Sequence, residues 1–168
     1  VLRSIEILFQ KYAIKAVKIG IVPSLDYLKE IVFTIKKLSP KTKIVWDTVL
    51  KSTTEFDFID IENQAVLIEI LKKIDLITPN YNEMQKLFPD YNSPLLWRRA
   101  GNIAYVLLKG GHNPEEIGLD YLFLKNEIFS LEPNTNGINI FEKHGSGCVL
   151  SSAITANLAL GHDIKTAC

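Results

Sequence analysis

Short apolar runs alternate with helix-length segments up to residue 108 of the chain. Each run is too short for a helix, and its residues are nearly all apolar, as in strands that are covered on both faces. Strands separated by helices require crossover connections, so they lie parallel in one sheet with helices on its faces. The pattern predicts strands at residues 16–22, 43–47, 75–78 and 103–108, and helices at residues 1–12, 25–38, 63–73, 80–87 and 95–101. We therefore expect an α/β fold with a mostly parallel sheet.

The remaining part of the chain has a different pattern. Residues 119–124 and 127–131 flank Lys125-Asn126, and this arrangement predicts a β-hairpin. A Gly-rich stretch at residues 143–152 then leads into an apolar run of small residues that Gly161 closes. This pattern predicts a loop that leads into the N-terminus of a buried helix, with Gly161 near the C-terminal end of that helix. At 168 residues the chain fits one domain with a substantial core.

The composition excludes several classes of protein. Lys plus Arg and Asp plus Glu are 19 each, so the net charge is zero, and no basic stripe suits nucleic acid. No apolar run is long enough to span a bilayer, and no polybasic segment suits a membrane surface. Two cysteines, Cys148 and Cys168, form no disulfide framework, and the sequence shows no signal peptide, so we expect a cytoplasmic protein. The glycine patterns of P-loop and dinucleotide-binding enzymes are also absent.

Polar residues and glycines follow the predicted strands at the same edge of the sheet. The carboxyl ends of parallel strands meet at one edge, where such sheets bind ligands, so we expect these residues to converge. The residues at this edge are Gly20, Asp47, Asn80, Lys109, Gly110, Gly111 and His112, together with the Gly-rich stretch. A carboxylate, an amide, an amine and a helix N-terminus suit a polyanion that carries a metal ion.

The Gly-rich stretch is a candidate anion site. Gly145 and Gly147 lack a Cβ atom, so the backbone can turn sharply and approach a ligand closely. The first N–H groups of the following helix have no partner within the helix, and the helix dipole adds positive potential, so a phosphate can bind there. The same potential favours the thiolate of Cys148. The alternative is an ordinary Gly-rich turn with a buried structural cysteine, and the local sequence does not separate the two.

Residues 144–154, His-Gly-Ser-Gly-Cys-Val-Leu-Ser-Ser-Ala-Ile, closely resemble the C-terminal signature of the hydroxymethylpyrimidine/phosphomethylpyrimidine kinases. These enzymes of the thiamine pathway belong to the ribokinase-like superfamily. The resemblance runs from about Ala16 to Gly161 and includes the Asn-x-x-Glu motif at Asn80 and the Lys-Gly-Gly-His turn at Lys109. It implies a ribokinase-like three-layer α/β/α sandwich that uses ATP and Mg²⁺ to phosphorylate 4-amino-5-hydroxymethyl-2-methylpyrimidine or its monophosphate, and it leaves a homodimer open.

The same resemblance implies a role for each matching residue. The anion hole and the proton acceptor would be formed by Gly145, Ser146, Gly147 and Cys148. The nucleotide would be bound by Lys109, Gly110, Gly111, Asn80 and His144. The metal ion would be held by Glu83 and Asp47. The pyrimidine pocket would be lined by Gly20, Ile21 and Val49.

Some of these residues also have a purely structural interpretation. Asn80 and Glu83 have the spacing of a capping box at the start of a helix. Lys109 can be a solvated lysine in a turn, and Asp47 can cap a helix or a loop. The sequence also departs from the family, because Asp47 lacks the proline that usually follows it and Ile21 stands in place of methionine.

Two other functions stay open. One is a pyridoxal kinase of the same fold, against which Cys148 argues, because those relatives carry an aspartate at this position. The other is a truncated relative that binds ligands without catalysis. Full-length family members begin with a strand and a Gly-Gly-Ala-Gly stretch that residues 1–168 do not contain. We therefore expect residues 1–168 to be one kinase domain that lacks these N-terminal parts and its C-terminal end.

Overall fold

A sheet of six strands runs through the part of the chain that the structure describes. This computed structural model describes residues 1–50, 61, 63–90, 99–112, 118–125, 127–133 and 145–168. The strands are β1 (Ala16–Ile19), β2 (Lys43–Trp46), β3 (Leu76–Ile77), β4 (Tyr105–Leu108), β5 (Asp120–Leu124) and β6 (Glu127–Leu131). They lie in the order of the sequence, with β1 to β4 parallel and β5 and β6 antiparallel to their neighbours. The predicted mostly parallel sheet and the predicted hairpin are therefore confirmed.

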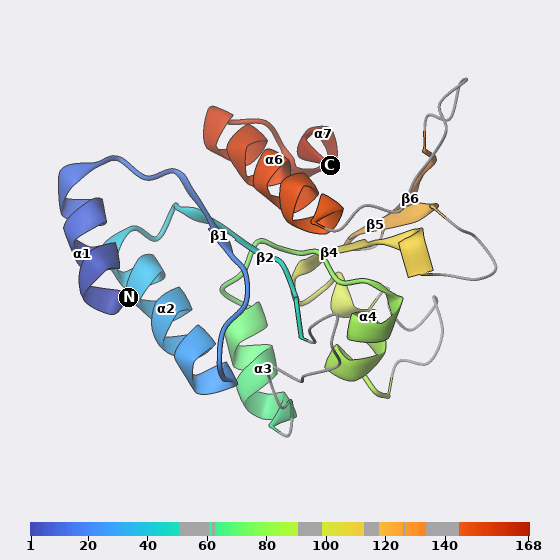
Figure 1. The fold of residues 1–168 in the computed structure, drawn as a ribbon, viewed down its shortest axis with the longest axis horizontal. Helices are drawn as coiled ribbons and strands as arrows, with labels where there is room; N and C mark the ends of the chain where they lie inside the picture. The colour runs from blue at the N-terminus through green and yellow to red at the C-terminus, as the bar shows by residue number, and fades with distance from the viewer. Residues whose placement is uncertain (51–60, 62, 91–98, 113–117, 126, 134–144) are drawn as a thin grey trace.

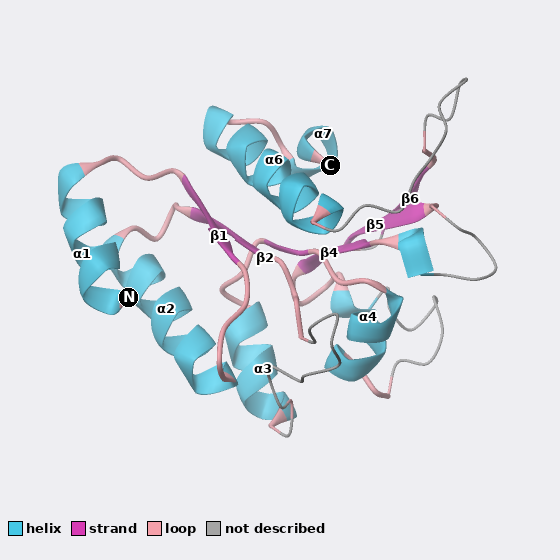
Figure 2. Cartoon of the chain, viewed as in Figure 1, coloured by secondary structure: helices cyan, strands magenta, loops and turns pink. Residues whose placement is uncertain are grey.

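Helices cover both faces of this sheet (Figures 1 and 2). On one face lie α1 (Leu2–Lys11), α2 (Leu25–Leu38), α3 (Gln64–Leu71) and α4 (Tyr81–Leu87). On the other face lie α6 (Ser146–Leu160) and the short α7 (Ile164–Ala167). Successive side chains of a strand point to opposite faces, so Trp46 belongs to the first apolar core and Val45 to the second. The result is a three-layer α/β/α arrangement.

The bounds of α2 follow from local chemistry and match the prediction. The Ser24 hydroxyl accepts a hydrogen bond from the Tyr27 N–H at 3.1 Å, which caps the first turn. The helix ends at Leu38, because Pro40 cannot continue it and restricts the residue before it. Its helical period places Leu28 and Ile35 in the core, where both are fully buried.

Some predicted bounds were wrong, and α6 is less buried than expected. β1 ends at Ile19 rather than residue 22, and β4 begins at Tyr105 rather than residue 103. The prediction of a buried helix holds for one face of α6 only, because Val149 and Leu160 are 71% and 77% exposed. A helix that lies on a single sheet buries only the stripe that faces it. The predicted helix at residues 95–101 lies largely outside the described residues.

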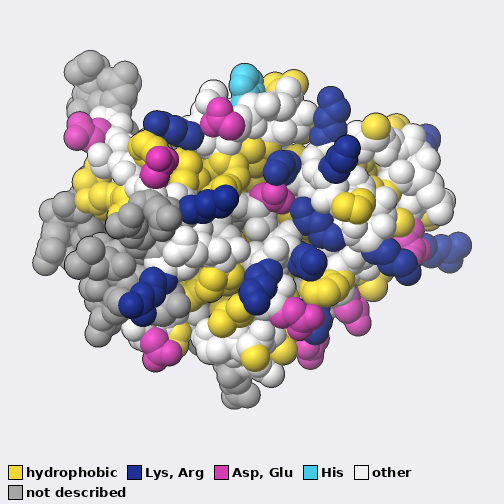
Figure 3. All heavy atoms as spheres, turned by 180° about the vertical axis from the view of Figure 1, so that it is seen from behind, with side chains coloured by type: hydrophobic (Ala, Val, Ile, Leu, Met, Phe, Trp, Pro, Cys, Tyr) yellow, Lys and Arg dark blue, Asp and Glu magenta, His cyan; other side chains and the backbone are white. Residues whose placement is uncertain are grey.

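The surface carries charges of both signs. Basic and acidic side chains are both present on the face that Figure 3 shows, as the equal numbers of the two kinds in the sequence lead one to expect. Among the described helices, none combines the length and the apolar character needed to cross a bilayer.

Candidate active site

The ends of the parallel strands bring the predicted polar residues together. Asp47 follows β2 and is held beside β1, because its N–H donates to the Ile19 carbonyl at 2.8 Å. Asn80 and Lys109 form an isolated parallel bridge beyond β3 and β4, and the Lys109 N–H donates to the Pro79 carbonyl at 2.8 Å. The convergence expected from the sequence is therefore present at the carboxyl edge of the sheet.

Asp47 is the centre of this edge. Its carboxylate is 1% exposed and accepts hydrogen bonds from Ser151 Oγ at 2.9 Å and from Thr78 Oγ1 at 3.3 Å. The ammonium groups of Lys18 and Lys109 lie 3.2 Å and 3.5 Å from its two oxygens. Burial alone would raise the pKa of Asp47, but Lys109, the Ser151 hydrogen bond and Lys18 together hold this pKa below its ordinary value. Asp47 is therefore a buried, ionised carboxylate between two lysines.

The Gly-rich turn meets both lysines. Gly145 has φ +88° and caps α6, whose first helical residue is Ser146. A Cβ atom at Gly147 would lie 3.1 Å from the Lys109 Nζ atom, so the glycine makes room for this ammonium group. Lys18 Nζ donates a hydrogen bond to the Cys148 carbonyl at 3.0 Å. Two cations thus lie beside a helix N-terminus that already carries positive potential.

Glu83 forms the capping box that the sequence allowed. Its carboxylate atom Oε2 accepts from the Asn80 N–H at 2.8 Å, and Asn80 Oδ1 accepts from the Glu83 N–H at 2.9 Å. Thr48 Oγ1 also donates to Oε2, at 3.3 Å. Burial raises the pKa of Glu83, although the Asn80 hydrogen bond and the charge of Lys109 oppose this shift.

The donor set fits Mg²⁺ at Glu83 better than at Asp47. Mg²⁺ takes oxygen ligands and keeps several of its waters, so one partly exposed carboxylate can serve it. Among the described residues, the contacts of the Glu83 carboxylate use one oxygen only. Both oxygens of Asp47 are engaged by lysines and hydroxyl groups, and its side chain is buried. In the described part of the chain, no three His, Cys, Asp or Glu side chains gather as a metal site.

Comparison with known proteins identifies the family. The family model described as phosphomethylpyrimidine kinase matches residues 1–168. The chain belongs to the phosphomethylpyrimidine kinase family. Within the curated proteins it is 34% identical over 164 residues to the bifunctional thiamine biosynthesis protein ThiDN of Methanocaldococcus jannaschii, covering 95% of this chain and 35% of that protein. It is 31% identical over 173 residues to a hydroxymethylpyrimidine/phosphomethylpyrimidine kinase of Aquifex aeolicus, covering 95% of this chain and 66% of that one.

Solved structures of similar proteins agree with this family assignment. A phosphomethylpyrimidine kinase from Clostridium difficile 630 has 32% identity and a TM-score of 0.75, over 99% of this chain and 69% of that one. A Bacillus subtilis pyridoxal kinase, solved as an ADP complex, has 25% identity and a TM-score of 0.76, over 98% and 63% of the two chains. The predicted ribokinase-like fold is confirmed. The chain spans less than two-thirds of the length of the two curated relatives.

Other residues predicted from the sequence have plainer surroundings. Gly20 follows β1, and Ile21 beside it is 57% exposed. The Val49 N–H donates to the Asp47 carbonyl at 2.8 Å, so its backbone is tied to the centre of the edge. Ser146 and Cys148 are exposed in the first turn of α6. His144 lies outside the described residues.

Three contributors to the site were not predicted from the sequence: Lys18, Ser151 and Thr78. In the sequence, Lys18 and Thr78 fall within predicted strands, and Ser151 falls within the Gly-rich stretch. Lys18 lies among apolar residues in β1, and a polar group that packing buries needs a partner, whereas Ser151 is one of several polar residues in α6. This signal was present in the sequence, but it does not name the partner.

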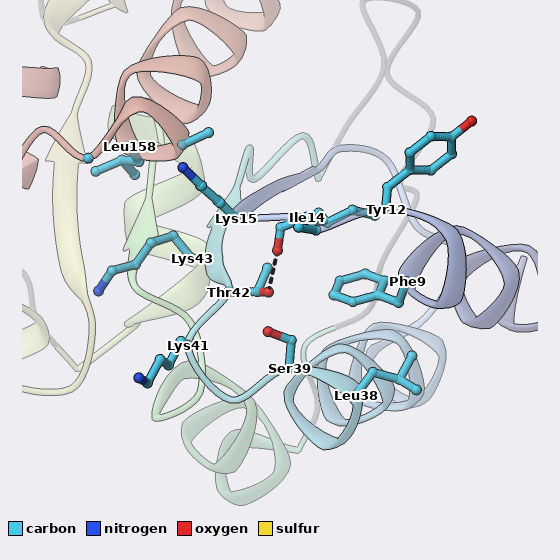
Figure 4. A pocket seen from close by; sticks show the side chains of 13 residues that line it. Phe9, Tyr12, Ile14, Lys15, Leu38, Ser39, Lys41, Thr42, Lys43 and Leu158 are labelled. Carbon is cyan, nitrogen blue, oxygen red and sulfur yellow. Dashed lines mark hydrogen bonds between the residues drawn. The ribbon is translucent and has the colours of Figure 1, made fainter.

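A pocket of about 590 Å³ lies at the opposite end of the sheet and contains none of the predicted site residues (Figure 4). Phe9 of α1 and Tyr12, which follows α1, line it together with Lys15 and Lys41. The C-terminal ends of α2 and α6 also open into it, and the negative ends of their dipoles oppose an anion there. The carboxyl edge of the sheet, rather than this pocket, is therefore the candidate active site.

Substitution of Gly110 tests whether the Lys-Gly-Gly turn requires a residue without a side chain at this position. Its N–H donates to Asp120 Oδ1 at 2.8 Å, and a Cβ atom at this position would overlap the Leu119 backbone. We expect Gly110→Ala to lower the free energy of unfolding by about 1–3 kcal/mol, because the turn must move away from β5. Gly111→Ala is the control, since nothing lies within 4 Å of a Cβ atom there, and its effect should stay within about 0.5 kcal/mol. Urea denaturation measures both, and equal losses would contradict the argument.

Proposed function

We propose that the protein transfers the γ-phosphoryl group of ATP to the hydroxymethyl group of 4-amino-5-hydroxymethyl-2-methylpyrimidine, or to the phosphate of its monophosphate. Family membership supports this type of reaction. The observation that supports it most strongly is the contact between Lys109 and Gly147. It brings a lysine and a helix N-terminus, two features that bind anions, together from distant parts of the chain. This combination suits a polyphosphate. A cytoplasmic location and a homodimer remain predictions.

The chemistry would be positioning and charge stabilisation. The alcohol oxygen attacks the γ-phosphorus, the bond to the ADP oxygen breaks, and the alcohol loses its proton. Backbone N–H groups of residues 145–148 would hold the oxygens of the transferring group. Lys109 would offset the charge of the phosphates as ADP leaves. The Sγ atom of Cys148 would accept the proton of the alcohol, which the exposure of this residue permits.

Mg²⁺ would neutralise phosphate charge, and Glu83 is the residue that we propose holds it, through its waters. Asp47 would then act on the two lysines instead of on the metal, because both of its oxygens are already engaged. Gly20, Ile21 and Val49 would face the pyrimidine from the ends of the first two strands.

An assay of the full-length protein with Mg-ATP tests the function. We expect phosphorylation of the hydroxymethylpyrimidine with a higher kcat/KM than for pyridoxal, and no turnover after Mg²⁺ is removed with a chelator. A higher kcat/KM for pyridoxal would assign the protein to the second candidate activity. Binding of the pyrimidine without any consumption of ATP would show a binding protein and reject the kinase.

Cys148→Ser tests the proton acceptor. Because a hydroxyl is a much weaker base than a thiolate, kcat should fall by about 10²–10⁴-fold with a smaller change in KM. Cys168→Ser is the matched control and should leave kcat unchanged, because Cys168 follows α7 and packs against the second apolar core, away from the carboxyl edge. Near-full activity of Cys148→Ser would show that the turn acts through its backbone alone.

The two cysteines also differ in expected reactivity. Burial, with the nearby charge of Asp120, raises the pKa of Cys168 to about 12, so this thiol should resist alkylation near neutral pH. Alkylation of the native protein should therefore occur at Cys148, and Mg-ATP should slow it. Mass spectrometry of the modified peptide identifies the site, and unchanged modification in the presence of Mg-ATP would place the nucleotide elsewhere.

Glu83→Gln separates the capping role from the metal role. Glutamine keeps an oxygen for the Asn80 N–H and removes a charge whose burial is unfavourable, so the stability should change little. If Glu83 holds Mg²⁺, the Mg²⁺ concentration for half-maximal activity should rise about tenfold or more.

Asn63→Ala is the control for capping alone. Asn63 caps α3 by accepting from the Val66 N–H at 3.1 Å, so its loss should cost about 1 kcal/mol without changing the Mg²⁺ requirement. If Glu83→Gln behaves like this control, the metal role of Glu83 is rejected.

A further inference from the structure

Lys18 joins two parts of the candidate active site. It lies within β1, among Ala16, Val17 and Ile19, and its side chain is 21% exposed. Its Nζ atom lies 3.2 Å from Asp47 Oδ2 and donates at 3.0 Å to the Cys148 carbonyl. A lysine that is held on two sides in this way has little freedom to turn toward a ligand.

Lys109 pairs with the same carboxylate in a looser geometry. Its Nζ atom lies 3.5 Å from Asp47 Oδ1, and it also lies beside Gly147 at the N-terminus of α6. A polyphosphate bound at this N-terminus would attract the Lys109 ammonium group away from the carboxylate. Asp47 would then lose one of its two cations and at the same time have new negative charge nearby.

A buried carboxylate without a cation is strongly unfavourable, and a neighbouring anion makes it worse. If Lys109 were the only partner of Asp47, every nucleotide that bound would have to meet this cost. With Lys18 in place, Asp47 keeps a cation and the Ser151 hydrogen bond on its other oxygen. The cost of moving Lys109 then falls.

We propose that Lys18 is the permanent counter-ion of Asp47 and thereby releases Lys109 to bind the phosphates of the nucleotide. This inference rests on the proposed function, since it concerns the nucleotide of that reaction. Lys18 is a positioning residue in this scheme, because it acts on the nucleotide through Asp47 and Lys109.

Calorimetric titration of the full-length protein with Mg-ADP tests the proposal. Lys18→Met should weaken binding by about 10- to 100-fold, the range expected when a hydrogen bond to a charged group is lost. The KM for ATP should rise by a similar factor, while kcat at saturating ATP should change less. Lys18→Arg keeps the charge and the donors, and its affinity should stay within about threefold of the native value.

Lys36→Met is a matched control. Lys36 also pairs with an aspartate, Asp75 at 3.1 Å, and also donates to a backbone carbonyl, that of Thr42 at 2.7 Å. Its side chain is 19% exposed, close to the value for Lys18. Asp75, however, directly precedes β3 and so lies at the opposite end of the sheet from Asp47. Lys36→Met should therefore cost stability without changing the affinity for Mg-ADP.

The double variant Lys18→Met/Asp47→Asn tests whether Lys18 affects the nucleotide affinity through Asp47. Without the carboxylate there is no charge for Lys18 to compensate, so Lys18→Met should change the affinity little in the Asp47→Asn background. An equal loss in both backgrounds would show that Lys18 affects nucleotide binding independently of Asp47, and the proposal would be wrong. If Lys18→Met does not fold, Lys18→Gln removes the charge with less loss of shape, and the same loss of affinity is expected.

The two proposals fail in different ways. If the native protein binds no nucleotide, the proposed function is rejected and this inference with it. If the native protein binds Mg-ADP and Lys18→Met binds it equally well, the proposed function stands and only the role of Lys18 is rejected.

Discussion

The structure of the carboxyl edge depends on one buried charge. Asp47 is ionised and almost wholly removed from water, a state that costs several kcal/mol unless the charge is paired and hydrogen-bonded. Its partners come from β1, from the residues that follow β3 and β4, and from α6. Because these partners all contact one carboxylate, it holds four parts of the fold in one relative position.

The architecture makes this pairing feasible. Parallel strands end at one edge, so Asp47 and Lys109 come from different strands to the same place without any long loop. α6 covers the other face of the sheet, contacts β1 and β2, and brings its first turn to the carboxyl edge. Gly147 then admits the Lys109 ammonium group, and the Cys148 carbonyl accepts from Lys18. A Cβ atom at position 147 would crowd this ammonium group, which would have to shift by a few tenths of an ångström.

Glu83 shows how stability and function share one residue. As a capping-box member it satisfies the Asn80 N–H, which supports α4. As a half-buried carboxylate with a raised pKa it also carries an electrostatic cost that glutamine would avoid. The cap therefore explains the oxygen at this position but not the charge, and a metal ion in the proposed reaction would explain the charge. The structural and the functional interpretations of the motif are compatible.

The sequence by itself determined the sheet, most of its strands and helices, and the edge at which the polar residues meet. These features follow from local patterns, namely short apolar runs, helical periods, caps and the residues just after each strand. Only the tertiary structure decided that Lys18 pairs with Asp47 and with the Cys148 carbonyl, a contact between residues 130 positions apart. Only it decided that Leu160 is exposed while Leu158 is buried, since that depends on which side of α6 faces the sheet. The physical reason is that a local pattern states that a polar group needs a partner or that a helix has an apolar side, whereas the packing of distant elements selects the partner and the side.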